Sequence, residues 1–270
     1  MEADLGLSRV YDAVLVVGDL AGFRWSATLS VAREVGGLGS KALVMPGNHD
    51  GPNPLQLLAE VAGTPRATGR FAPGQVARCE ALREALGQAQ MVGYSAHEVG
   101  PEEDRVTIVA ARPHSMGGPS LSFPTYLQQA YGITSLAASV ARMCAVIDSV
   151  STERIVFLAH NGPTGLGANR ADIWGCDFRA AQGDWGDPDL AEAIAYAKSR
   201  GKRVLAVVAG HMHRKLRGGG QRVWRVERDG VLYLNTARVP RIDRSGRHHL
   251  HLEIDGERVS AEDRLLKGVE

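Results

Sequence analysis

Four short polar signatures, each directly after an apolar run, constrain the fold of this chain most strongly. The runs are short, rich in Val and Leu, and do not alternate with polar residues, which is the pattern of strands buried on both faces. The signatures are Gly18-Asp19, Gly47-Asn48-His49-Asp50, Ala159-His160-Asn161 and Gly210-His211-Met212-His213. Because the carboxyl ends of neighbouring strands in an open α/β sheet meet at one crevice, we expect these distant signatures to form a single site.

Strand-like and helix-like segments alternate along the chain, which indicates a layered α/β architecture. Strands are expected at 13–17, 42–45, 90–94, 106–110, 155–158 and 204–209, and helices at 26–35, 54–62, 75–86, 135–150 and 188–200. Three later runs, 221–228, 231–235 and 248–254, alternate in part and are expected to be antiparallel strands extending a second sheet. The longest loop, 161–187, is predicted either to close over a substrate or to pack on itself.

Composition limits the classes of protein that need to be considered. The 270 residues are 44% hydrophobic and carry a net charge of +1, so charge does not favour a general nucleic-acid binder. Three widely spaced cysteines do not make a disulfide framework, which favours a reducing compartment. Met1-Glu2-Ala3-Asp4 is not a basic leader and no apolar run approaches a membrane span, so the expected location is the cytoplasm, with no membrane partner. The oligomeric state is left open.

The carboxylate, carboxamide and imidazoles of the four signatures are the inventory of a metal site. Asp19 can bridge two cations through its two oxygens. Asn48, His160 and His211 would complete the ligands of one cation, and His213 could reach the other. Such a pair of cations polarises a phosphoryl group and generates hydroxide at neutral pH.

His49 stands beside a candidate ligand without being needed as one. It is therefore the candidate acid that protonates the leaving alkoxide, or alternatively a positive clamp on the oxyanion of the transition state.

In their order and spacing, the four signatures resemble the calcineurin-like metallophosphoesterase superfamily across residues 18 to 213. The resemblance implies a two-sheet sandwich flanked by helices, a four-layer α/β/β/α fold, with two divalent metals drawn from Mn, Fe, Zn and Mg. When the family's residue roles are carried over one by one, Asp19 bridges the two metals, His213 holds one of them, and His49 is the catalytic histidine. The other metal is held by Asn48, His160 and His211.

The chain departs from that family at its start. The family has an Asp-x-His signature on a first strand before Gly-Asp, and neither Asp4 nor Asp12 has a histidine two positions later. The interpretation is one phosphoesterase domain over 1–270 that lacks its first strand. Either the start codon is placed too far downstream, or the protein holds one metal or none.

The predicted function is metal-dependent hydrolysis of a phosphomonoester or small phosphodiester by attack of metal-bound hydroxide, with a small phosphorylated substrate as the partner. A degenerate, non-catalytic scaffold of the same fold is the alternative. A nuclease is the third possibility, supported by the arginine-rich stretch 214–247 and opposed by the balanced charge.

Other polar residues have competing interpretations. His248, His249 and His251 suit one exposed strand face, and His97 and His114 are expected to be structural. Several arginines near strand ends or in the long loop are candidates for binding phosphate, although each could equally be a solvated charge: Arg112, Arg170, Arg179, Arg214 and Arg238.

Overall fold

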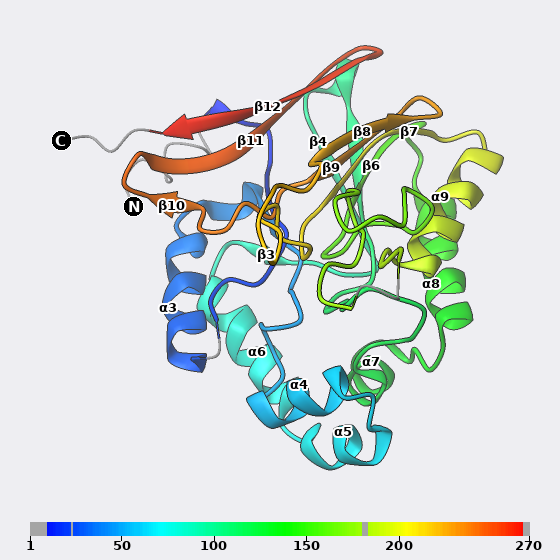
Figure 1. Cartoon of the computed structure of the whole chain (residues 1–270). Coiled ribbons are helices and arrows are strands. Elements are labelled where there is room, and N and C mark those ends of the chain that lie inside the picture. The colour runs from blue at the N-terminus through cyan, green and yellow to red at the C-terminus, as the bar shows by residue number, and fades with distance from the viewer. Residues whose placement is uncertain (1–9, 23, 180–182, 267–270) are drawn as a thin grey trace.

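A computed structural model describes residues 10–22, 24–179 and 183–266 (Figure 1). It shows a mixed α/β protein with several sheets. Asp4 and the start of the chain, to which the leader prediction applied, lie outside the described residues.

The largest described sheet has six strands in the order β4-β5-β6-β7-β9-β8. Its strands are β4 (Ser95–Val99), β5 (Val106–Ala110), β6 (Arg154–Leu158), β7 (Arg203–Ala209), β8 (Arg225–Arg228) and β9 (Val231–Asn235). The four central strands are parallel, and β4 and β8 pair antiparallel at the two edges. The central strands therefore deliver their carboxyl ends to one side of the sheet.

Two smaller sheets complete the described β-structure. One is parallel and consists of β1 (Val14–Val16), β2 (Ala42–Val44) and β3 (Gln90–Met91). The other is antiparallel and consists of β10 (Ile242–Asp243), β11 (Gly246–Asp255) and β12 (Arg258–Leu266).

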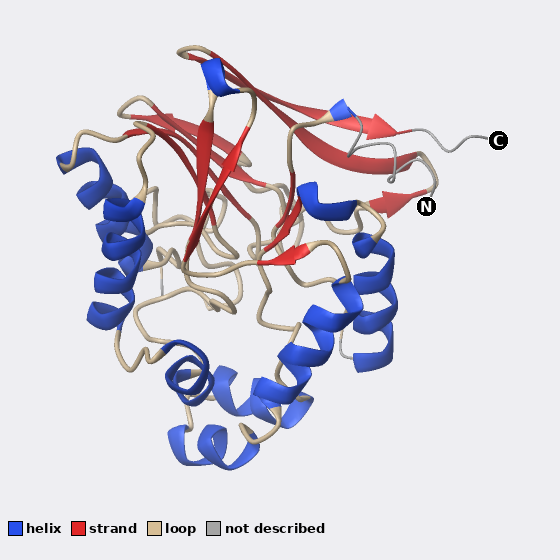
Figure 2. Ribbon diagram, turned by 180° about the vertical axis from the view of Figure 1, so that it is seen from behind, coloured by secondary structure: helices blue, strands red, loops and turns tan. Residues whose placement is uncertain are grey.

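The helices lie outside the sheets in both views (Figures 1 and 2). They are α3 (Trp25–Gly36), α4 (Pro54–Val61), α5 (Pro65–Phe71), α6 (Gln75–Leu86), α7 (Pro124–Tyr131), α8 (Leu136–Ser149) and α9 (Pro188–Ser199), with short 3₁₀ turns at Gly39–Lys41 and Glu102–Asp104. Local chemistry sets several ends. The Asn53 side chain accepts from Gln56 N at the start of α4, the Ser135 side chain accepts from Ala138 N at the start of α8, and Gly87, with φ 58°, ends α6.

Three apolar clusters hold these elements together. One joins the six-stranded sheet to α7, α8 and α9 through residues such as Phe157, Met143 and Leu190. A second joins the sheets to one another, with Leu43 packed in the same cluster as Leu158. The third joins the β1-β2-β3 sheet to α3 and α6. Burial of these apolar faces is the main force that positions the strand ends.

Most expected elements are confirmed, and several boundaries are corrected. The 106–110 strand, the 75–86 helix and the 231–235 strand match the structure. The 90–94 strand is shorter, ending at Met91, and the 221–228 strand begins only at Arg225. The predicted antiparallel pairing of the 221–228 and 231–235 runs is confirmed for β8 and β9, but their placement in a second sheet is wrong. The 231–235 strand is buried throughout and also pairs parallel with β7, so both strands belong to the six-stranded sheet. Of the three runs, the 248–254 run lies in a separate antiparallel sheet.

The segment 124–149 is long and apolar enough to cross a membrane by length and composition alone, contrary to the expectation from the sequence. In the structure it forms two helices, α7 and α8, separated at Gly132. Leu127, Met143 and Ile147 from these helices lie in the core cluster beneath the six-stranded sheet. The segment is therefore only weak evidence for a membrane span.

A buried ion-pair network lies at the carboxyl end of β5. Arg112 is 2% exposed, and its guanidinium donates to Asp187 at 3.0 Å and to Asp189 at 2.8 Å. Ser115 Oγ donates to Asp187 and Ser139 Oγ to Asp189. The prediction that Arg112 binds phosphate is therefore wrong. Its guanidinium is buried and already forms ion pairs with two aspartates at the start of α9.

Replacing Arg112 with Met is expected to lower the free energy of unfolding by about 3–5 kcal/mol, because it leaves two buried carboxylates without a cation. Chemical denaturation would measure the change. Arg105→Met provides the control, since Arg105 pairs with Glu98 at the surface and such pairs contribute about 0–1 kcal/mol. Equal losses in the two variants would contradict this account.

Candidate metal centre

The Gly18-Asp19 turn follows β1 in a conformation that few residues adopt. Gly18 has φ 86° and Asp19 has φ 53°. A Cβ on Gly18 would lie 2.6 Å from the Met45 carbonyl oxygen, so the turn can lie against the chain that leaves β2 only because this residue is Gly. The turn aims the Asp19 carboxylate at the second signature, where its Oδ1 accepts from His49 N at 3.0 Å.

The Asp50 carboxylate holds the first two signatures together. It accepts backbone N–H groups from Asp19 at 2.7 Å, Leu20 at 2.9 Å and Gly47 at 2.7 Å. Asp50 is fully buried, and burial together with the negative charge of Asp19 raises its pKa to about 7. Asp50 is not one of the predicted site residues, and only its place in the Gly47–Asp50 signature indicates its importance.

His160, which follows β6, links the six-stranded sheet to the small parallel sheet. Its Nδ1 lies 2.5 Å from the Val17 carbonyl oxygen, which can only accept, so Nδ1 carries the proton. In the neutral ring Nε2 then presents a lone pair. This Nε2 lies 3.0 Å from Asn48 Oδ1 and 3.6 Å from Asp19 Oδ2. Three atoms bearing lone pairs therefore face one another, an arrangement that a cation would satisfy.

His211 adds a fourth group, from the turn that follows β7. Its ring centroid is 5.0 Å from that of His160, and one ligand atom from each of Asp19, His160 and His211 falls within 4.8 Å of the other two. The buried Nδ1 of His211 has no hydrogen-bond partner among the described residues. Burial and the proximity of His160 lower the pKa of His211 to about 3, so its ring is neutral and able to act as a ligand.

The donor set fits a divalent metal. The pKa of Asp19 lies below the usual value of 3.8: burial raises it, but the electrostatics of the surrounding imidazole groups and the hydrogen bond from the His49 backbone N–H lower it by more. The two imidazoles suit Zn or Fe, and the carboxylate and amide oxygens suit harder cations such as Mn, so this mixed set favours a transition metal over Mg. Asp19, His160 and His211 therefore form a group that could hold a metal, with Asn48 directly beside it.

The other two predicted site residues lie differently. His213 is exposed and is not a member of the compact group, although Asp19 lies close enough to act on its pKa, which burial lowers overall. His49 is half-buried, and its backbone N–H donates to Asp19. The roles assigned to both histidines stay predictions.

The long loop 161–187 packs on the protein over its described parts. Arg222 is buried and donates to carbonyl oxygens of the loop, including Asp172 at 2.9 Å, and to His213 O at 3.0 Å. Asn235 donates to Ile173 O at 3.1 Å and to Met212 O at 2.7 Å. These contacts tie the loop to the turn that carries His211, which favours the self-packed interpretation.

The remaining histidines and arginines have local partners. His114 is buried and bonds to Gly47 O through Nδ1 at 2.7 Å, in keeping with a structural role. His248 is buried beside Asp243, so the prediction of one exposed face for His248, His249 and His251 is wrong. Arg170 and Arg179 donate to backbone oxygens, and Arg214 pairs with Asp263 at 2.6 Å and stacks over Trp224.

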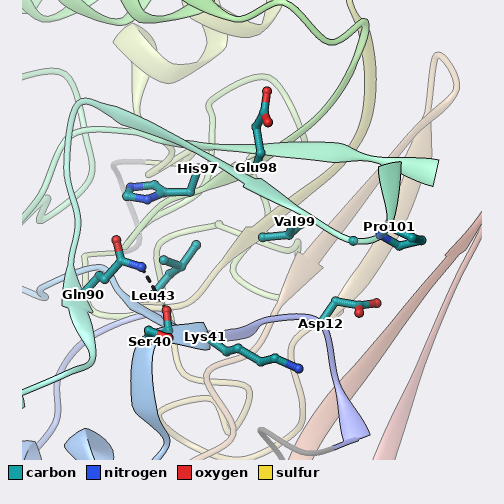
Figure 3. Close-up of a pocket in the computed structure, with 10 residues that line it drawn as sticks. Asp12, Ser40, Lys41, Leu43, Gln90, His97, Glu98, Val99 and Pro101 are labelled. Carbon is teal, nitrogen blue, oxygen red and sulfur yellow. Dashed lines mark hydrogen bonds between the residues drawn. The ribbon is translucent and has the colours of Figure 1, made fainter. Parts of the chain in front are cut away.

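A cavity of about 760 Å³ lies at the opposite end of the strands (Figure 3). Lys41 and Gln90, from the amino ends of β2 and β3, line it together with His97 and Glu98 of β4. Because the four signatures occupy the carboxyl ends, this cavity is separate from the candidate metal centre.

Nineteen chains of solved structures match this chain, and the following two do so at low identity. One is a provisionally named 5'-nucleotidase from Staphylococcus aureus, solved with alpha-ketoglutarate; the TM-score is 0.39 at 10% identity, over 96% of this chain and 54% of that one. The other is the calcineurin-like phosphoesterase YfkN from Bacillus subtilis, with a TM-score of 0.32 at 9% identity, over 94% of this chain and 89% of that one. The chain thus spans about half the length of the first. No family model matches the chain, and no curated protein matches it either.

Replacing Asp50 with Ala is expected to destabilise the protein and to disorder the Asp19 turn. Three backbone donors would lose their acceptor, and each buried unsatisfied group costs about 1–3 kcal/mol. Chemical denaturation would measure stability and Co²⁺ titration would measure metal affinity. Asp148→Ala, at an exposed residue of α8, is the control. Unchanged stability and unchanged Co²⁺ affinity in Asp50→Ala would rule out the positioning role.

Proposed function

We propose that this chain is a metal-dependent phosphoric ester hydrolase acting on a phosphomonoester or a small phosphodiester. The observation that supports it most is the convergence of Asp19 Oδ2, Asn48 Oδ1 and His160 Nε2, with His211 beside them. The proposed ligands are Asp19, Asn48, His160 and His211 for one metal, with His213 directed to a second.

When bound, a divalent cation would polarise the phosphoryl group and provide a nucleophile from water at neutral pH. The protein's own part is to fix the ligand atoms. The Val17 carbonyl holds the His160 ring in the tautomer that leaves Nε2 available. The Asp50 carboxylate fixes the turn that carries Asp19.

His49 is proposed as the proton donor to the leaving alcohol. Its backbone is anchored to Asp19 Oδ1 at 3.0 Å, so its position is coupled to the candidate ligands. The half-buried side chain is accessible to a substrate. A positioned acid of this kind typically contributes about 10²–10⁴-fold to a rate.

The finer fold assignment is part of the same proposal. The shared apolar cluster between the sheets and the clusters beneath the helices support a four-layer α/β/β/α sandwich in one domain. We further propose a small phosphorylated molecule as the substrate and the cytoplasm as the location.

Elemental analysis after dialysis is expected to give closer to one metal than two per chain, because the compact group supplies ligands for one cation while His213 lies outside it. His211→Ala should abolish tight Co²⁺ binding, and His97→Ala should leave it unchanged, since His97 lies at the opposite end of the strands. Two tightly held metals per chain would contradict the assignment of ligands, and Co²⁺ binding that His211→Ala does not weaken would remove the metal centre itself.

Replacing His49 with Asn should slow hydrolysis while metal content stays nearly constant, whereas Asn48→Ala should lower both. The defect should grow as the leaving alcohol becomes more basic, because a nitrophenolate hardly needs a proton and an alkoxide does. Rates on p-nitrophenyl and alkyl phosphates would show this. An equal loss of rate on both substrates in His49→Asn would favour the alternative role of His49, a positive group that stabilises the oxyanion of the transition state. The absence of metal-dependent hydrolysis in the unmodified protein would favour the non-catalytic scaffold.

A further inference from the structure

A second hollow, of about 250 Å³, opens beside His49. Its walls come from the start of α3, the loop after the second signature and the first turn of α6. The lining includes Trp25, Thr28, His49, Pro52, Pro54 and Arg78. Apart from His49, none of the residues assigned to the candidate metal centre lines it.

Three of the lining residues carry apolar rings. Trp25 is half-buried at the first position of α3, and its indole lines the hollow. Pro52 and Pro54 face the same space from the segment that leads into α4. An indole beside two prolines favours a flat ring, which can stack without ordering flexible side chains.

Arg78 gives the hollow a cation that forms no ion pair with a carboxylate among the described residues. The side chain is half-buried; its Nε donates to Gly51 O at 2.6 Å, and its Nη2 has no hydrogen-bond partner in the described part of the chain. The buried arginines Arg112, Arg214 and Arg222 differ, because each pairs with an aspartate. Cys79 cannot act as the counter-ion, because burial raises the pKa of its thiol to about 12.

A partly buried cation without an acidic partner is costly, and an anion entering the hollow would offset that cost. Arg also forms strong charge-assisted hydrogen bonds with carboxylates and phosphates. The hollow therefore combines a stacking surface with an anion-binding group, and His49 lies at its border with the candidate metal centre.

We propose that this hollow binds the alcohol part of the ester, with a flat ring against Trp25 and a second negative charge directed to Arg78. This inference rests on the proposed function and narrows its substrate class to phosphate esters of anionic ring-containing alcohols. The alcohol part is the one that enters, because His49, the proposed donor of a proton to that part, lines the hollow.

Two matched substrates test the inference, phenyl phosphate and 3-carboxyphenyl phosphate, with kcat/KM measured from phosphate release. The wild type should prefer the carboxylated ester by about tenfold, the effect of one charge-assisted hydrogen bond. Arg78→Gln should abolish this preference and Arg78→Lys should retain part of it. Arg83→Gln is the control, since Arg83 is exposed on the same helix and pairs with Glu80. A wild type without preference, or equal ratios in Arg78→Gln and Arg83→Gln, would overturn the proposal.

A binding experiment separates this inference from the proposed function. Calorimetric titration of the purified protein with 3-hydroxybenzoate and with phenol should show tighter binding of the anion, and Arg78→Gln should remove the difference. Trp25→Leu should weaken the binding of 3-hydroxybenzoate several-fold. This second variant tests the proposal if Arg78→Gln does not fold. Selective binding without hydrolysis would support the hollow while contradicting the proposed hydrolase. Hydrolysis without selective binding would overturn the proposed role of the hollow and leave the proposed hydrolase function standing.

Discussion

The hydrogen bond between His160 Nδ1 and the Val17 carbonyl is the contact on which the candidate site depends. It joins the end of β6, in the six-stranded sheet, to the end of β1, in the small parallel sheet. The same bond fixes the tautomer of His160 and turns Nε2 toward Asn48 and Asp19. The same hydrogen bond thus joins the two sheets and leaves His160 Nε2 free to bind a metal.

Around this contact, buried side chains form hydrogen bonds with the backbone groups of the turns. Asp50 satisfies three backbone donors at the first two turns, and Arg222 satisfies loop carbonyls beside the last one. Each side chain replaces water that the packed sheets exclude, so the turns that carry Asp19 and His211 do not depend on solvent for their shape. Arg78 differs from the buried Arg112, Arg214 and Arg222 in having no ion pair with a carboxylate among the described residues, which is why we assign it to a ligand rather than to the fold.

Sequence patterns predicted what depends on local chemistry. The apolar runs located the strands that carry the four signatures, and the helices expected at 54–62, 75–86 and 135–150 begin within one residue of the observed helices. The convergence of Asp19 with His160 and His211 follows from one rule, that parallel strands deliver their carboxyl ends to one edge.

Pairing between distant segments was not predictable in the same way. The strand β9 is buried on both faces and therefore belongs inside the six-stranded sheet. The partial alternation of apolar and polar residues in its sequence did not reveal this burial. The helices α5 and α7 and the strands β4 and β12 had no clear periodicity and were not expected. Arg112 looked like a phosphate ligand because its two aspartates lie more than seventy residues away along the chain.

The span of the Val17–His160 contact has a consequence for how the protein forms. The two residues are 143 positions apart along the chain. Closing so long a loop costs entropy that the contacts formed at its end must offset. The ligand atoms are therefore brought together only when the two sheets are docked, so metal binding would report on that docking.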